Sequence, residues 1–307
     1  MPRKPSSAIP KSSTSKSSTV EKSLTSTKVL KKSTALPTPK QKTAGKKNVK
    51  QSNEIGALFS KALDLHLQGK LQEAWVLYQE VIKLSPQYFD AIHSLGLIAA
   101  QMGNFEMAMQ LFEQAVGINP KNPQVHNNMA NALASMGKGV EALAQYDQAV
   151  ALEPNYAEAF NNRGILLRGL KQLTEAAESY TKATAINPGF VEAFFNRGNV
   201  LVELRQFIPA IQSYDAAIDL NENHAAALNN RGVVLRSLKQ PDLALKNFDR
   251  AIAAKADYID AYNNRAYTLL DLKKYSEALK SFEQALALKP DYQSALEGKA
   301  QALKAGK

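Results

Sequence analysis

A period of 34 residues constrains this chain most, because it runs seven times without insertion from Ile55 to Tyr292. We number the places within one unit from 1 to 34. Place 8 is always Ala or Gly, place 20 is always Ala, and place 24 is always Tyr or Phe. Place 20 holds Ala74, Ala108, Ala142, Ala176, Ala210, Ala244 and Ala278, and place 24 holds Tyr78, Phe112, Tyr146, Tyr180, Tyr214, Phe248 and Phe282. Such regularity predicts a stack of similar modules rather than one globular core.

Each unit is predicted to contain two amphipathic helices, because places 4, 8 and 11 and places 20, 24 and 27 follow helical spacing. Small residues at places 8 and 20 let the two helices approach, and we expect the aromatic ring at place 24 to fill the gap between neighbouring pairs. Proline ends the second helix in five units. Glu222 and Ala256 take its place in the other two, where we expect looser turns or slightly longer helices.

The order of small, small, aromatic and proline positions resembles the tetratricopeptide repeat. The resemblance implies an all-α solenoid, in which antiparallel helix pairs form a right-handed superhelix and the first helices line its concave face. We expect a capping helix at 293–307, where Leu296, Ala300 and Leu303 continue the first-helix pattern. The units that the resemblance implies are 55–88, 89–122, 123–156, 157–190, 191–224, 225–258 and 259–292.

Residues 1–54 differ from the repeats in composition. They carry a net charge of +11 and contain eighteen Ser or Thr but no aromatic residue, whereas the rest of the chain carries −1. We expect a disordered basic arm. Its possible roles are weak, nonspecific contact with nucleic acid or an anionic surface, targeting, or solubilisation. No segment has the apolar length of a membrane span, and no secretory signal is evident, so we expect a cytoplasmic protein.

A column of Asn at place 6 is the main candidate binding site, because the resemblance directs this place toward the concave face. An amide both donates and accepts, so such a column can bind the backbone of an extended peptide. A similar column holds peptides in the superhelix of protein O-GlcNAc transferase. The competing interpretation is that these amides bridge adjacent helices. The peptide-binding candidates are Asn128, Asn162, Asn196, Asn230 and Asn264 at place 6, Asn127 and Asn161 at place 5, and Asn131 and Asn199 at place 9, while Asn229 and Asn263 also occupy place 5.

Charged residues form further columns on the first helices. For Arg at place 7 we favour packing against the adjoining repeat over recognition of an acidic ligand. Carboxylates at place 2 oppose Arg168 and Arg236 at place 12, which argues against a surface of one sign. The place-7 residues are Arg163, Arg197, Arg231 and Arg265, and the place-2 carboxylates are Asp90, Glu158, Glu192 and Asp260.

The sequence offers little for catalysis. It contains no cysteine and no glycine-rich phosphate loop, and its four histidines occupy unlike places. His93 and His126 could approach one another, but two histidines without a third ligand make a weak metal site. We therefore expect no catalytic residue, no cofactor and no metal.

The favoured function is a non-enzymatic scaffold or adaptor that binds extended segments of protein partners. One alternative is a regulatory or substrate-selecting partner, or truncated relative, of a protein glycosyltransferase, because similar runs reading NNRG often precede sugar-transfer domains. The other is a nucleic-acid-associated protein that uses the basic arm.

Overall fold

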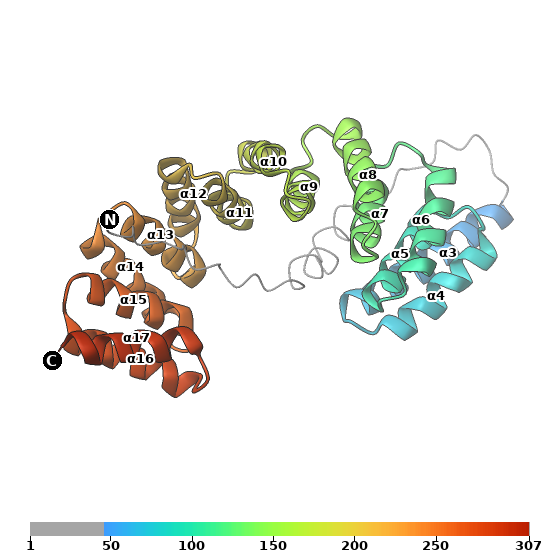
Figure 1. Cartoon of the computed structure of the whole chain (residues 1–307). Helices are drawn as coiled ribbons and strands as arrows, with labels where there is room; N and C mark the ends of the chain where they lie inside the picture. The colour runs from blue at the N-terminus through green and yellow to red at the C-terminus, as the bar shows by residue number, and fades with distance from the viewer. Residues whose placement is uncertain (1–45, 307) are drawn as a thin grey trace. The chain divides into compact units, whose positions relative to one another are not determined.

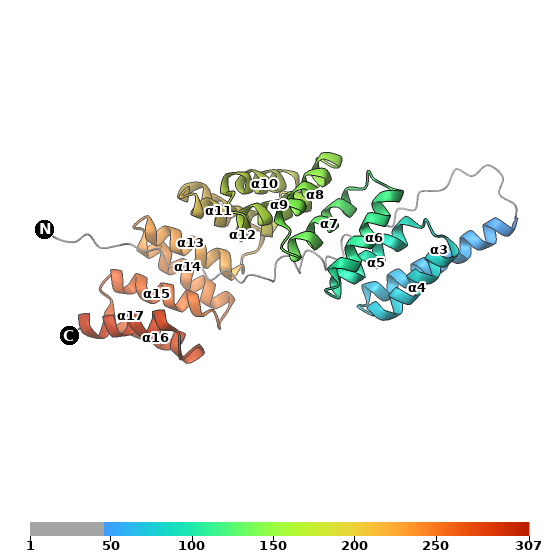
Figure 2. The same ribbon diagram turned by 45° about the vertical axis from the view of Figure 1, so that its right-hand side comes forward.

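A computed structural model describes residues 46–306, and over this range the chain consists of fifteen helices with no strand. They form two compact bodies, an N-terminal body that ends at Pro154 and a C-terminal body that begins at Asn155. Within each body successive helix pairs stack one after another (Figures 1 and 2). The expected all-α repeat architecture is confirmed. The expected disorder of residues 1–45 lies outside the described residues.

The helices follow the 34-residue period. Apart from α3, every first helix covers places 1–13, and every second helix covers places 17–30. The N-terminal body contains α3 (Lys46–Leu67), α4 (Leu71–Leu84), α5 (Phe89–Gln101), α6 (Phe105–Ile118), α7 (Pro123–Ser135) and α8 (Gly139–Leu152). The C-terminal body contains α9 (Ala157–Gly169), α10 (Leu173–Ile186), α11 (Val191–Glu203), α12 (Phe207–Leu220), α13 (Ala225–Ser237), α14 (Pro241–Ala254), α15 (Ile259–Asp271), α16 (Tyr275–Leu288) and α17 (Gln293–Ala305).

Helix α3 begins at Lys46, so residues 46–54, which the composition placed in the arm, are helical. This segment contains no Pro or Gly and includes Lys, Gln and Glu, all of which favour helix. A helix anchored by repeat 1 can therefore continue toward the N-terminus beyond the start of the period.

The second helices of the two repeats that lack proline are not extended, so the longer-helix alternative drawn from Glu222 and Ala256 is wrong. Both α12 and α14 end at place 30, as in the other repeats. The following residues, Asn221 and Lys255, already have extended backbone, with ψ of 92° and 96°. Because the chain leaves the helix at place 31, proline at place 32 is not needed to stop it.

The aromatic residue at place 24 packs inside its own repeat. A Cβ atom added to Gly198 would lie 2.5 Å from the Tyr214 ring, and one added to Gly232 would lie 2.6 Å from the Phe248 ring. The ring therefore occupies space that a small place-8 residue leaves between the two helices of one pair. The ring also reaches the next first helix, as expected, because a Cβ atom added to Gly298 of α17 would lie 2.2 Å from the Phe282 ring.

The turn between the two helices of every repeat contains one residue in the left-handed region, always at place 15. This residue reverses the chain after the first helix. Repeats 1 to 3 use glycine, which adopts positive φ without strain, but repeats 4 to 7 use a basic residue. These residues are Gly69, Gly103 and Gly137, then Lys171, Arg205, Lys239 and Lys273.

Candidate functional site

The first helices of successive repeats lie side by side in the C-terminal body, where α9 contacts α11, α11 contacts α13, and α13 contacts α15. We call the side chains at places 2, 5, 6, 9 and 12 of these four helices the first-helix face. Six of the nine Asn residues that the sequence analysis selected belong to it, and the other three lie on α7 of the N-terminal body.

The place-6 amides join neighbouring repeats. Asn196 donates its Nδ2–H to Oδ1 of Asn161 at 3.2 Å, and Asn264 donates to Oδ1 of Asn229 at 2.9 Å. Both bonds connect place 6 of one repeat to place 5 of the repeat before it, a separation of 35 residues. The amides therefore do bridge adjacent helices, as the competing interpretation held. Each bond uses only part of the hydrogen-bonding capacity of an amide.

Phe195 interrupts this arrangement, because repeat 5 has no amide at place 5. Asn230 turns instead to Asn199, whose Oδ1 it reaches at 2.9 Å, and the Tyr214 hydroxyl donates to the same oxygen at 2.8 Å. Asn229 donates to Oδ1 of Asn230 at 3.1 Å. Repeats 5 to 7 thus share one connected amide network.

Accessibility distinguishes three of the nine selected Asn residues, all in the C-terminal body. Asn127, Asn128 and Asn131 of α7 are 3%, 3% and 1% exposed. Asn131 accepts a hydrogen bond from Tyr146, and Asn127 donates to Asn128 at 3.4 Å. In the C-terminal body Asn161 and Asn162 are buried as well and Asn196 is 9% exposed, whereas three amides remain partly exposed. These are Asn199, Asn230 and Asn264.

The Arg residues at place 7 face the seam between repeats. Arg231 donates to Asn247 at 2.8 Å and pairs with Asp215 of the preceding repeat. Arg265 likewise reaches Ser281 and pairs with Asp249 at 2.6 Å. The favoured packing role is therefore observed for these two residues, although their guanidinium groups reach side chains rather than helix-end carbonyls.

Arg197 is the exception in this column. The place that Asp215 and Asp249 occupy in later repeats holds Thr181 in repeat 4. The Nε atom of Arg197 is buried without a hydrogen-bond partner. Burial lowers the pKa of Arg197, because a desolvated cation without a carboxylate is disfavoured.

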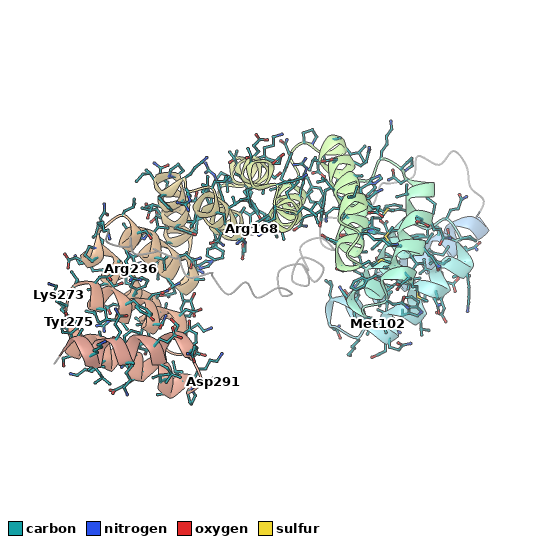
Figure 3. The ribbon with its side chains drawn as sticks, in the orientation of Figure 1. Met102, Arg168, Arg236, Lys273, Tyr275 and Asp291 are labelled. Carbon is teal, nitrogen blue, oxygen red and sulfur yellow. The ribbon has the colours of Figure 1, made fainter. Side chains whose placement is uncertain are left out.

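Both cations of the first-helix face, Arg168 and Arg236, are neutralised. Arg168 pairs with Glu203 at 2.5 Å and Arg236 pairs with Asp271 at 2.7 Å, again across a separation of 35 residues. Figure 3 labels the two arginines. These partners were not predicted from sequence, because they occupy different places of the repeat: the contacts connect place 12 to place 13 of the next repeat. The 35-residue spacing of opposite charges was the available signal.

The remaining charges near the start of these helices are acidic. Asp260 accepts a hydrogen bond from the Tyr292 hydroxyl at 2.7 Å. Glu158 and Glu192 form no ion pair with any cation that the structure describes. One edge of the first-helix face is therefore negative, as the place-2 residues indicated.

The two neighbouring histidines have other partners. His93 Nε2 lies 2.9 Å from Asn128 Nδ2, and burial lowers the pKa of His93 to about 4. His126 contacts Gln145 at 2.8 Å and the Pro120 carbonyl at 3.1 Å. Within residues 46–306 no group of three or more His, Cys, Asp or Glu side chains could hold a metal ion. No helix in this range could span a membrane.

Family models described as tetratricopeptide repeat match residues 65–130, 99–161, 157–190, 195–259 and 259–292. The chain belongs to the tetratricopeptide repeat family. Proteins of this family are generally protein-interaction scaffolds. The matched segments 157–190 and 259–292 coincide with repeats 4 and 7. No curated protein matches the chain.

Solved tetratricopeptide structures resemble the chain. One is YrrB, described as a protein with an unusual peptide-binding site, with 28% identity, a TM-score of 0.55, and 62% of this chain and 97% of YrrB covered. The C-terminal part of a repeat protein from Cytophaga hutchinsonii has 16% identity, a TM-score of 0.66, and coverage of 78% and 98%. Pseudomonas aeruginosa PilF has 21% identity, a TM-score of 0.60, and coverage of 69% and 97%. The last two similarities concern the fold alone.

Proposed function

We propose that this chain is a non-catalytic adaptor that binds an extended peptide segment of a partner protein across the first-helix face. The observation that carries the proposal is the connected amide network of repeats 5 to 7, in which Asn199, Asn230 and Asn264 are fixed in orientation and partly exposed. The family's general role as a scaffold supports it, as does the peptide-binding site described for YrrB.

An extended peptide suits this network chemically. Asn199 uses its Oδ1 twice but keeps its Nδ2–H groups, and Asn264 uses one N–H but keeps its Oδ1. A peptide backbone offers one donor and one acceptor per residue. It can therefore hydrogen-bond to the unused groups of both side-chain amides, whatever the peptide sequence. Because the bonds among the amides already fix their orientation, binding needs little further ordering of side chains.

The acidic edge gives this peptide a charge preference. Glu158 and Glu192 lie at place 2 without a cation, while Arg168 and Arg236 are held by carboxylates of their own chain. A basic side chain on the ligand would pair with the unpaired carboxylates of Glu158 and Glu192. It would meet little repulsion from Arg168 and Arg236, whose charges are neutralised. We therefore propose a ligand with Lys or Arg on the side that faces place 2.

The test begins with selection of peptides from a random displayed library against the full chain, followed by affinity measurement by fluorescence anisotropy. The variant Asn199→Ala with Asn264→Ala should weaken an enriched peptide by about tenfold or more, because it removes two polar contacts. Asn247→Ala is the control, since it removes two intramolecular hydrogen bonds, against three in the double variant, but lies on α14, away from the face. Equal losses in both variants, with helicity retained, would contradict the proposal.

The charge preference is tested separately. Glu192→Gln removes an exposed carboxylate from the face, and Glu222→Gln removes one from the loop after α12. We expect only the first to weaken a Lys-containing peptide, by several-fold and more strongly at low salt. If the two variants behave alike, the acidic edge does not select the ligand.

A further inference from the structure

The two ends of the repeat array differ in polarity. In repeats 2 to 7 places 3 and 10 of the first helix pack toward the preceding second helix; in α11, for example, Ala193 and Val200 are fully buried. The same places of α3 hold Ala57 and Asp64, with Lys61 between them at place 7, and all three are exposed. Helix α3 therefore presents a largely polar outer face and closes the array itself.

Helix α17 has the opposite character. It buries Ala295, Gly298 and Ala302 but leaves Leu296 43% exposed and Leu303 48% exposed, with Ala300 exposed between them. In the repeats these places, 4, 8 and 11, are covered by the second helix of the same pair. The place-11 leucines of repeats 3 to 7 show the contrast, because they are 1–8% exposed: Leu133, Leu167, Leu201, Leu235 and Leu269.

The exposed stripe of α17 is complementary to itself. When two copies of one helix pack antiparallel about Ala300, Leu296 of each meets Leu303 of the other, and the small Ala300 side chains let the helices approach at the crossing. The same register places Glu297 of each copy beside Lys304 of the other. Both side chains are exposed, so each pair is free to form at the rim of the contact.

We propose that α17 forms a two-fold symmetric, tail-to-tail dimer of this chain. A two-fold contact uses the same patch on both copies and closes at two, which fits a stripe that complements itself. Head-to-tail stacking is disfavoured, because it would press Leu296 and Leu303 against the polar column of Lys61 and Asp64 on α3. Two leucines on each side bury little area, so the dimer is weak and forms at micromolar concentration.

Sedimentation velocity of the full chain, from low micromolar to several hundred micromolar, tests the dimer. We expect a concentration-dependent shift from monomer to dimer. Leu303→Glu should weaken dimerisation by at least about tenfold, because it puts two like charges into the contact. Leu243→Glu is the control, since Leu243 is 47% exposed on α14 and lies outside the proposed contact. A chain that stays monomeric, or a dimer that survives Leu303→Glu, would overturn the proposal.

Charge exchange tests the register without depending on fold stability. Glu297→Lys alone and Lys304→Glu alone should each weaken the dimer several-fold, and the double exchange should restore it. Restoration requires that the two side chains face each other across the two-fold axis, because they stand seven residues apart on their own helix. A double exchange that is as weak as the single ones would refute the antiparallel register.

Discussion

Asn264 donates its side-chain N–H to the side-chain Oδ1 of Asn229 at 2.9 Å, so one amide pair ties repeat 7 to repeat 6. Asn263 occupies the corresponding acceptor place of repeat 7, but the residue that would donate to it is Gly298. Its Oδ1 is buried without a partner. The amide-to-amide link therefore ends at repeat 7, and Asn263 instead donates its Nδ2–H to the Ser294 hydroxyl of α17 at 3.2 Å.

Removing the acceptor of this link should destabilise the C-terminal body. Asn229→Ala leaves the Asn264 N–H without its acceptor and removes the bond from Asn229 to Asn230, at a cost of about 1–3 kcal/mol. Asn263→Ala should cost less, because it removes a single hydrogen bond, to Ser294, and its buried Oδ1 accepts nothing. Urea unfolding followed by circular dichroism measures both. Equal costs would show that the link contributes nothing specific.

A carboxylate at residue 181 should stabilise the protein. Thr181→Asp would give Arg197 the partner that Asp215 gives Arg231, and we expect a gain of about 0.5–1 kcal/mol in the free energy of unfolding at low salt. Thr181→Asn has a similar shape without the charge and serves as control. A gain that persists in high salt, or that Thr181→Asn shares, would contradict an ionic origin.

The basic residues with left-handed backbone conformation in repeats 4 to 7 predict a second substitution that stabilises the protein. Lys239 has φ of 62°, a conformation that glycine adopts with less strain. Lys239→Gly should raise the free energy of unfolding by about 0.5–1 kcal/mol. Lys239→Ala loses the same charge but keeps the strain, so it should not stabilise. Thermal unfolding of both variants distinguishes relief of strain from an effect of charge.

His93 predicts a loss of stability in acid. Its pKa is lowered to about 4 by burial, so the folded chain binds a proton less readily than the unfolded chain, whose His pKa is 6.5. Its contribution is complete above pH about 6.5 and declines as the pH falls toward about 4, by about 2–3 kcal/mol. His93→Asn supplies the amide found at place 5 in other repeats and should reduce this decline. Urea midpoints measured at several pH values report the difference, and an unchanged pH dependence would exclude His93 as its source.

The helix pairs could be predicted because Ala at place 20 and an aromatic residue at place 24 repeat with the period itself. Contacts between repeats could not be predicted by the same approach. Asn161 and Asn196 occupy different places of the repeat, so a comparison of equivalent places in successive repeats does not pair them. Their bond depends on the small rotation between successive first helices, which sets the separation at 35 rather than 34 residues.

The exposure of Leu303 could not be predicted from its place in the repeat pattern. Leu303 continues place 11, which is buried in repeats 2 to 7. It is exposed because burial at place 11 comes from the second helix of the same pair, and the described part of α17 has no such helix beside it. Pattern alone gives the face that a residue occupies, but not whether a neighbour covers it.

Hydrogen–deuterium exchange of the full chain, with and without an enriched peptide, tests the central claim most directly. Binding at the first-helix face should slow exchange in α11, α13 and α15 and leave α12, α14 and α16 unchanged, because ligand contacts raise the cost of local opening where they are made. Protection confined to the second helices, or to residues 1–45, would contradict peptide binding by the amide network.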